Sequence, residues 1–165
     1  MEPRFDFQDS GLRAQLTAAM RAASDLSPLL EDIGEQMTNS ARERIGETNT
    51  APDGTPWPKS FRVTVAQGGK TLYDTGDLYR RITSRVVGQE VHVGSNLPYA
   101  AVHQFGATIT AKTAKGLSFR LADGTKVLVG SVTIPARPYL GISRDDEEVI
   151  GDLVNIHWET VLGNG

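Results

Sequence analysis

The chain has 165 residues, a formal net charge of −3 and no cysteine. The lack of cysteine excludes disulfides, thiol nucleophiles and thiolate-bound zinc, and the slightly acidic balance lacks the basic excess typical of nucleic-acid-binding proteins. We expect one domain over residues 1–165, because a chain of this length can bury a core of its own. With no apolar run at the N-terminus and no stretch of about 18 uncharged apolar residues, we expect neither a signal peptide nor a membrane span.

Two helices are predicted in the N-terminal part of the chain. The first runs from Ser10 to Ala23, and its apolar residues recur at helical spacing: Leu12, Leu16, Ala19, Met20 and Ala23. The second begins at Ser27, which we expect as the N-cap, with Pro28 in the first helical position. Its apolar stripe consists of Leu30, Ile33, Met37, Ala41 and Ile45.

Residues 46–69 predict a long loop. Their Thr, Pro, Gly and Asn residues supply turn conformations and sustain neither helix nor sheet well. Trp57 lies between Pro56 and Pro58, which makes it a stiff apolar anchor. We expect its indole to be buried against the second helix and to tie the loop down.

A short helix and a hairpin are predicted next. Asp74 or Thr75 can cap a helix that contains Leu78, Tyr79 and Ile82. Residues 83–87 and 90–94 then alternate with period two around Gly88-Gln89, the pattern of a tight β-hairpin. In the second strand this alternation places Val91 and Val93 on one face and His92 toward solvent.

The segment from Tyr99 to Phe105 predicts a short buried helix that ends at Gly106. Four strands follow, at 108–110, 117–121, 126–129 and 131–134, with a hairpin turn at Asp123-Gly124. Residues 111–116 hold only Ala, Lys, Thr and Gly, which is poor material for a core. We therefore expect residues 108–132 to form an extended hairpin that leaves the body of the domain and serves contacts between subunits.

The last predicted helix begins after Ser143, its N-cap, and ends at Gly163. Four acidic residues occupy its first turns, where the helix dipole favours negative charge: Asp145, Asp146, Glu147 and Glu148. Its apolar stripe consists of Val149, Ile150, Leu153, Val154, His157, Trp158 and Val161.

Asp74-Thr75-Gly76 is the sharpest catalytic motif, because aspartic peptidases carry this tripeptide at the active carboxylate. The chain has one copy, so a peptidase would need a dimer, and the residues are also those that a helix start selects. His92, His103 and His157 lie on different predicted elements and lack the spacing of metal ligands. We expect no catalytic residue, no cofactor and no metal.

Two further segments indicate contacts. The hairpin carries a diffuse basic group, Lys112, Lys115, Arg120 and Lys126, which favours a solvated hairpin protected from edge pairing over a phosphate-binding surface. Pro135 and Pro138 hold Arg137 on a stiff, extended segment. Such an arginine can pair with a carboxylate inside the domain or across an interface, and both alternatives stay open.

Four segments stand in a distinctive order along the chain. They are residues 52–57 (Pro-Asp-Gly-Thr-Pro-Trp), 74–78 (Asp-Thr-Gly-Asp-Leu), 99–106 (Tyr-Ala-Ala-Val-His-Gln-Phe-Gly) and 134–140 (Ile-Pro-Ala-Arg-Pro-Tyr-Leu). In order and spacing they resemble the phage virion morphogenesis family of tail completion and neck proteins, from about Ile33 to the final helix. The resemblance implies an α+β fold, in which N-terminal helices and a C-terminal helix pack on an antiparallel sheet.

The resemblance also implies structural roles for particular residues. Trp57 would brace the loop. The start of the middle helix would be formed by Asp74, Gly76 and Leu78, and the central helix with its exit by Tyr99, His103, Phe105 and Gly106. The approach to the last helix would be formed by Pro135, Arg137 and Pro138.

The function that the resemblance implies is structural. The chain would form a homo-oligomeric, hexameric ring at the head-tail junction or tail end of a virion, assembled in the host cytoplasm, and would bind neck, connector and tail tube proteins. DNA would meet it only by passing through the ring lumen. We expect Phe119, Arg137 and Tyr139 at the contacts between subunits, since aromatic residues and arginine dominate such contacts. The alternatives are a maturation hydrolase that uses Asp74 and a nucleic-acid-binding accessory module.

Overall fold

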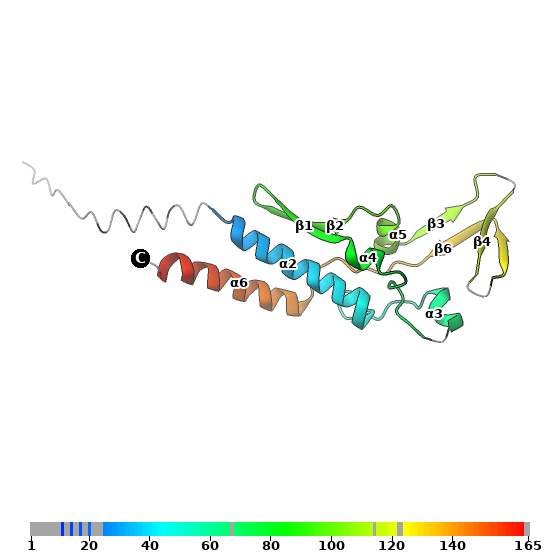
Figure 1. Cartoon of the computed structure of the whole chain (residues 1–165), viewed down its shortest axis with the longest axis horizontal. Coiled ribbons are helices and arrows are strands. Elements are labelled where there is room, and N and C mark those ends of the chain that lie inside the picture. The colour runs from blue at the N-terminus through cyan, green and yellow to red at the C-terminus, as the bar shows by residue number, and fades with distance from the viewer. Residues whose placement is uncertain are drawn as a thin grey trace, which may run out of the picture.

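The computed structural model describes residues 11, 14, 17, 20, 25–66, 68–113, 115–121 and 124–163. Most of the first predicted helix, Ser10 to Ala23, lies outside these residues. The described elements are α2 (Ser27–Glu43), a π-helical turn η1 (Arg44–Thr48), α3 (Phe61–Ala66), α4 (Asp77–Arg80), β1 (Ile82–Val87), β2 (Glu90–Ser95), α5 (Ala100–Phe105), β3 (Ala107–Thr110), β4 (Leu117–Arg120), β5 (Lys126–Val129), β6 (Ser131–Ile134) and α6 (Arg144–Gly163). The predicted α+β class is confirmed, with the strands arranged as three two-stranded antiparallel sheets (Figure 1).

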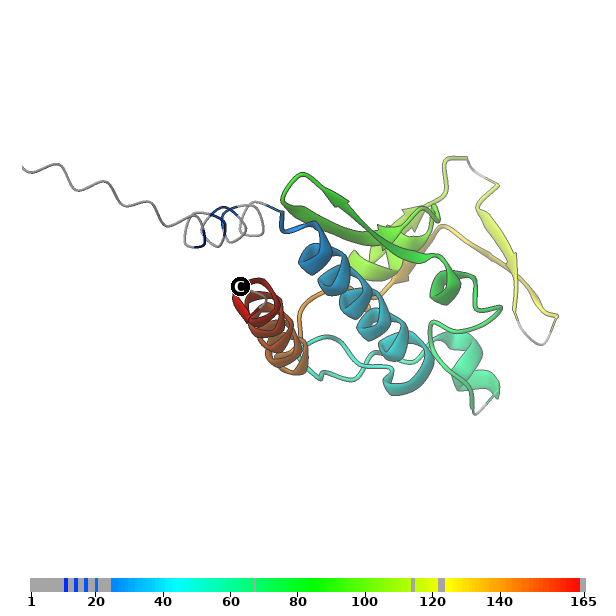
Figure 2. The ribbon, with the colours of Figure 1, turned by 60° about the vertical axis from the view of Figure 1, so that its left-hand side comes forward.

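Helix α2 is the centre of the body. The β1-β2 hairpin packs on one side of it and α6 on another, as Figures 1 and 2 show from two directions. The hairpin approaches closely at Gly34, where an added Cβ atom would lie 2.9 Å from the Cβ and Oγ atoms of Ser84. A glycine at this position therefore lets the helix and the sheet come into contact.

The apolar face of α2 is broader than the predicted stripe. Ala41 and Ile45 are buried as expected, whereas the predicted residues Leu30, Ile33 and Met37 are only half-buried. Leu29, Gly34 and Thr38 are buried in addition. The reason is that α2 has two packing partners on different sides, so no single stripe describes its contacts.

The start of α2 also differs from the prediction. Leu26 takes the N-cap position, and Pro28 lies within the first two helical positions. The backbone N–H of Ser27 donates to Asp25 Oδ1 at 3.1 Å, and no side chain caps the helix. The prediction of Ser27 as a capping residue was therefore wrong.

Between α2 and β1 the chain is more structured than predicted. Within the expected loop, residues 61–66 form the short helix α3. Helix α4 has only four residues, and its N-cap is Gly76, which has a left-handed φ of 81°. No side chain caps the helix, so the prediction that Asp74 or Thr75 caps it was wrong. Ile82, predicted inside this helix, instead starts β1 and is completely buried.

The β1-β2 hairpin confirms its prediction. Val87 pairs with Glu90 across the two-residue connection Gly88-Gln89. Val91 and Val93 are half-buried on one face, and the side chain of His92 is exposed and pairs with Glu90 at 3.2 Å.

The last four strands form an arm beyond the body. Strand β3 pairs with β6, and the chain between them forms the β4-β5 pair. These strands lie where the sequence predicts them, and Asp123 of the predicted turn lies outside the described residues. Figure 1 shows the arm projecting from the side of the body opposite the C-terminal end of α6.

The core lies where α2, the loop, β1 and α5 meet. It consists of Ala41, Ile45, Trp57, Leu72, Leu78, Ile82, Ala100 and Tyr139. Tyr139 and Ile45 are among the most completely buried side chains. The approach to α6 is therefore built into the centre of the molecule.

Candidate functional site

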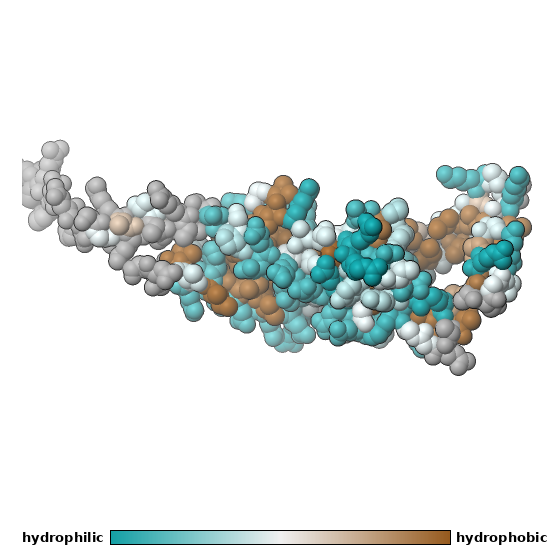
Figure 3. Space-filling model, viewed as in Figure 1, coloured by the Kyte–Doolittle hydropathy of each residue, from teal (hydrophilic) through white to brown (hydrophobic). Residues whose placement is uncertain are grey.

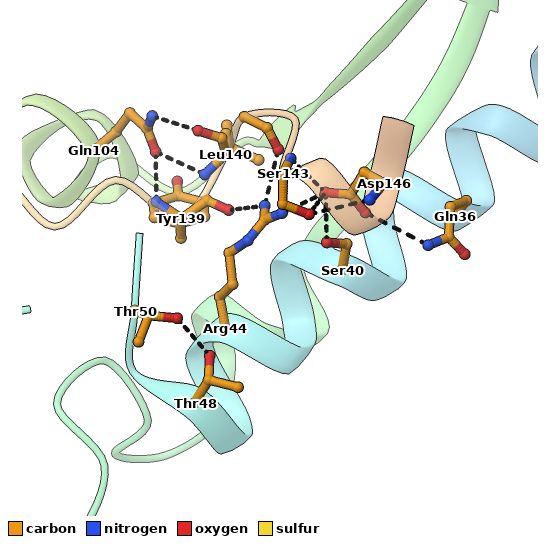
Figure 4. Close-up of polar contacts among 11 residues, drawn as sticks. Gln36, Ser40, Arg44, Thr48, Thr50, Gln104, Tyr139, Leu140, Ser143 and Asp146 are labelled. Atoms are coloured by element: carbon orange, nitrogen blue, oxygen red, sulfur yellow. Dashed lines mark hydrogen bonds and ion pairs between the residues drawn. The ribbon is translucent and has the colours of Figure 1, made fainter. Parts of the chain in front are cut away.

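A buried polar junction fixes α6 to α2 (Figure 4). Arg44 forms an ion pair with Asp146, and the side chains are 7% and 2% exposed. The same guanidinium donates to the carbonyl oxygens of Tyr139 at 3.1 Å and Gly141 at 2.9 Å. One arginine thus holds both the first turn of α6 and the backbone that leads into it.

Ser143 and Asp146 cap α6 reciprocally. The Ser143 hydroxyl oxygen accepts from the Asp146 N–H at 3.2 Å, and Asp146 Oδ2 accepts from the Ser143 N–H at 2.9 Å. This is a capping box, and it confirms Ser143 as the predicted N-cap. The prediction that the acidic residues of the first turn act through the helix dipole is therefore only partly right. Asp145 and Glu147 are exposed, whereas Asp146 points inward and is buried.

The environment of Asp146 favours its charged form. Desolvation is the largest influence and raises the pKa of the carboxyl. Hydrogen bonds from Ser143 and Ser40 and the charge of Arg44 act in the opposite direction, and together they hold the pKa below its ordinary value. The carboxylate is therefore paired and charged at neutral pH.

Gln104 of α5 holds the same stretch of backbone from the other side. Its Oε1 atom accepts from the N–H groups of Tyr139 and Leu140, both at 3.0 Å. Its Nε2 atom donates to the Leu140 carbonyl oxygen at 3.0 Å. Sequence reasoning missed this role, because an amide between His103 and Phe105 carries no pattern of its own.

Trp57 and Arg137 join the loop to the proline-rich segment. Trp57 is buried, and its indole N–H donates to the Pro138 carbonyl oxygen at 3.0 Å. Arg137 Nε donates to the Pro58 carbonyl oxygen at 2.7 Å, and Nη2 donates to that of Lys59 at 3.4 Å. Arg137 therefore binds backbone carbonyls inside the chain, where a carboxylate partner had been expected.

Helix α5 is present as predicted, but it is not buried as predicted. Among its residues only Ala100 is buried, and Phe105 is 78% exposed. The helix presses its small residue against the core, while the ring of Phe105 points to solvent. Gly106 ends the helix with a φ of 72° and lies against the backbone of Ala136, as an exit glycine should.

An open pocket of about 340 Å³ brings five of the predicted motif residues together: Asp74, Gly76, Leu78, Tyr99 and His103. Burial of the His103 ring lowers its pKa, and the nearby charge of Arg137 lowers it further. The Asp74 side chain is 73% exposed and pairs with Arg62 at 3.5 Å. Asp77, on the same pocket wall, accepts from Thr75 and Arg80.

A larger apolar groove of about 670 Å³ lies between α3 and the arm. It is lined by Phe61, Arg62, Phe119, Arg120, Leu121, Val127 and Val132. Brown apolar surface is visible at the arm in Figure 3. Of the three residues expected at subunit contacts, Phe119 is 39% exposed, whereas Arg137 and Tyr139 are 5% and 1% exposed.

In the described part of the chain, no group of three or more His, Asp or Glu side chains is arranged to hold a metal ion. No helix of the described ranges combines the length and apolar character needed to cross a bilayer. Besides the junction, the pocket and the arm groove, open hollows of about 220 and 400 Å³ lie beside the junction and along the β1-β2 hairpin.

Comparison with known proteins gives a consistent result. Residues 7–159 match the phage virion morphogenesis family. The chain is 30% identical over 152 residues to the Mu-like prophage FluMu G protein 2 of Haemophilus influenzae, covering 90% of this chain and 92% of that protein. It is 26% identical over 164 residues to tail completion protein S of Escherichia phage P2, covering 94% and 96%. No solved structure matches the chain significantly.

Proposed function

The chain belongs to the phage virion morphogenesis family, and on this premise we propose that it assembles into a ring at the junction of head and tail. The family and its relatives make it a phage tail completion or virion morphogenesis protein. Our proposal adds the homo-oligomeric, hexameric ring, with neck, connector and tail tube proteins as its neighbours. It also adds assembly in the host cytoplasm and passage of DNA through the ring lumen.

The observation that supports assembly is the arm. Phe119 is 39% exposed and Leu128 is 65% exposed on a pair of strands that stands away from the body. Large apolar side chains gathered on a projecting element are typical of protein interaction sites. A ring of identical copies would cover such an arm by repeated contacts between two different surfaces.

We propose further that the protein does not catalyse a reaction. An aspartic peptidase keeps two carboxyl groups together, sharing one proton. Here Asp74 is open to solvent and faces Arg62, and the other aspartate of the pocket is held by Thr75 and Arg80. Each of the two aspartates is thus paired with an arginine.

The test is the mass of the purified protein and its presence in particles. Native mass spectrometry should show a species near six times the chain mass of 17.8 kDa, and immunolabelling should place it at the neck of virions. A protein that stays monomeric at all concentrations and is missing from purified virions would overturn the proposal.

A further inference from the structure

Helix α6 carries a second patterned face besides the one that packs on α2. Ile142, just before the helix, and Val149 and Ile156 within it are 59%, 38% and 58% exposed. They follow one another at steps of seven residues. Three acidic residues fill the intervals at spacings of three and four, and all of them are exposed: Asp145, Asp152 and Glu159.

These spacings place the helical members on one side of α6, because an α-helix repeats every 3.6 residues. Leu153, Val154 and His157 of the predicted apolar stripe are half-buried and lie on a different side, whereas Val149, predicted in the same stripe, is exposed. The outer side is thus an alternating row of apolar and acidic side chains, which we term the acidic ridge: Ile142, Asp145, Val149, Asp152, Ile156 and Glu159. From Asp145 to Glu159 it is about 21 Å long.

The arm carries the opposite charge. Residues 107–134 contain four cations, Lys112, Lys115, Arg120 and Lys126, against one carboxylate, Asp123, which lies outside the described residues. Arg120 and Lys126 stand directly opposite each other in the β4-β5 register. Like charges in that position destabilise a strand pair, and neither residue has an ion pair with a described residue.

The arm groove also offers an apolar surface beside these cations. Phe119 and Val127 are paired across β4 and β5, and both line the groove together with Phe61 of α3. Phe61 is 55% exposed. A partner that fits must therefore bring apolar side chains and negative charge together, which is the composition of the acidic ridge.

The two surfaces cannot meet within one chain. Figures 1 and 2 show α6 and the arm on opposite sides of the body, with α2 and the hairpin between them. Brown patches appear at both places in Figure 3. Complementary surfaces at opposite ends of a molecule join successive copies head to tail, and such contacts close into a ring when the rotation permits.

We propose that the acidic ridge of one copy docks in the arm groove of the next. Ile142, Val149 and Ile156 enter beside Phe61 and Phe119, and the carboxylates approach Arg120 and Lys126. This inference rests on the self-association proposed above and names its two surfaces. The occupant is a second copy, because the chain itself presents the complementary charge and apolar pattern.

Charge exchange in the full-length protein tests the proposal. One variant reverses the arm (Arg120→Glu with Lys126→Glu), and a second reverses the ridge (Asp152→Lys with Glu159→Lys). Each alone should raise the concentration for half-assembly at least about tenfold, because like charges then face each other. A mixture of the two variants, or all four changes in one chain, should restore assembly, since opposite charges meet again.

Matched controls make the same charge changes elsewhere. Arg81→Glu with Arg85→Glu and Glu31→Lys with Glu35→Lys alter exposed residues of the body. They should assemble as the wild-type protein does. Circular dichroism of every variant shows whether the fold is retained, and the restored assembly of the mixture requires that both variants are folded.

The outcomes separate the inference from the proposed function. If the wild-type protein assembles and the reversed variants assemble equally well, or the mixture fails to recover, this interface is wrong and the ring proposal stands. If the wild-type protein is strictly monomeric and missing from virions, the proposed function itself fails. If reversal of the arm abolishes binding to double-stranded DNA in a filter assay and leaves assembly unchanged, the arm is a nucleic-acid surface and the inference is overturned.

Discussion

Arg44 and Asp146, 102 residues apart in sequence, form a buried ion pair that fixes α6 to the turn η1 directly after α2. The pair is not isolated, since Ser40 and Ser143 donate to the same carboxylate oxygen at 3.0 and 2.7 Å. Buried charges persist only when they are paired and hydrogen-bonded in this way. The pair therefore determines the position from which α6 presents its outer face.

Asp146→Ala should lower the free energy of unfolding by about 3–5 kcal/mol, because it leaves the Arg44 charge buried without its partner. Chemical denaturation followed by circular dichroism measures this loss. The control is Glu148→Ala, which breaks an exposed pair with Arg144 and should change stability by less than about 1 kcal/mol. Equal effects of the two substitutions would show that the buried pair is not a main support of α6.

Stability should fall in acid as Asp146 is protonated. The folded protein holds the pKa of this carboxyl below its ordinary value of 3.8, so Asp146 contributes its full stabilisation of the fold above that pH. This stabilisation is lost as the pH falls through the lowered pKa of the folded protein. Denaturation curves from pH 6 downward should show this decline, and the decline should be shallower in Asp146→Asn. Identical slopes for both proteins would contradict the assignment.

Gly106→Ala should destabilise the protein by roughly 2 kcal/mol or more, because the left-handed, extended conformation here is essentially confined to glycine. An added Cβ would also lie 2.8 Å from the Ala136 nitrogen and 3.0 Å from the Ile134 oxygen. Thermal unfolding measures the effect. Gly151→Ala serves as the control, since a Cβ added there meets no atom within 4 Å. Alanine in the middle of a helix is more favourable than glycine, so this variant should be about 0.5–1 kcal/mol more stable than the wild-type protein. A Gly106→Ala variant as stable as the wild-type protein would refute the requirement for glycine at the end of α5.

Asp74→Asn distinguishes the structural role from the catalytic alternative. The substitution removes an exposed partner of Arg62 and should lower stability by about 1 kcal/mol or less. In a complementation assay, phage particles should form at the wild-type level. Complete loss of particles, accompanied by accumulation of an uncleaved precursor and a normally folded protein, would favour the maturation hydrolase.

The sequence predicts elements best where local chemistry decides them. Ser143 was predicted as an N-cap and caps α6, and Gly88-Gln89 was predicted as a two-residue turn and joins β1 to β2. In both cases a few neighbouring residues supply all the hydrogen bonds or dihedral angles required. Such features need no information from the rest of the fold.

Prediction fails where distant segments decide the outcome. The burial of Asp146 depends on Arg44, which no local pattern connects to it, and Arg137 finds the carbonyls of Pro58 and Lys59 across the fold. Ile82 also belongs to a strand because Glu90 to Ser95 pairs beside it. These outcomes follow from tertiary packing, which overrides the local pattern.

The short backbone stretch from Tyr139 to Gly141 is hydrogen-bonded from two directions, by the amide of Gln104 and by the guanidinium of Arg44. The direction in which α6 leaves the core is consequently set by two other parts of the fold, α5 through Gln104 and the turn η1 through Arg44.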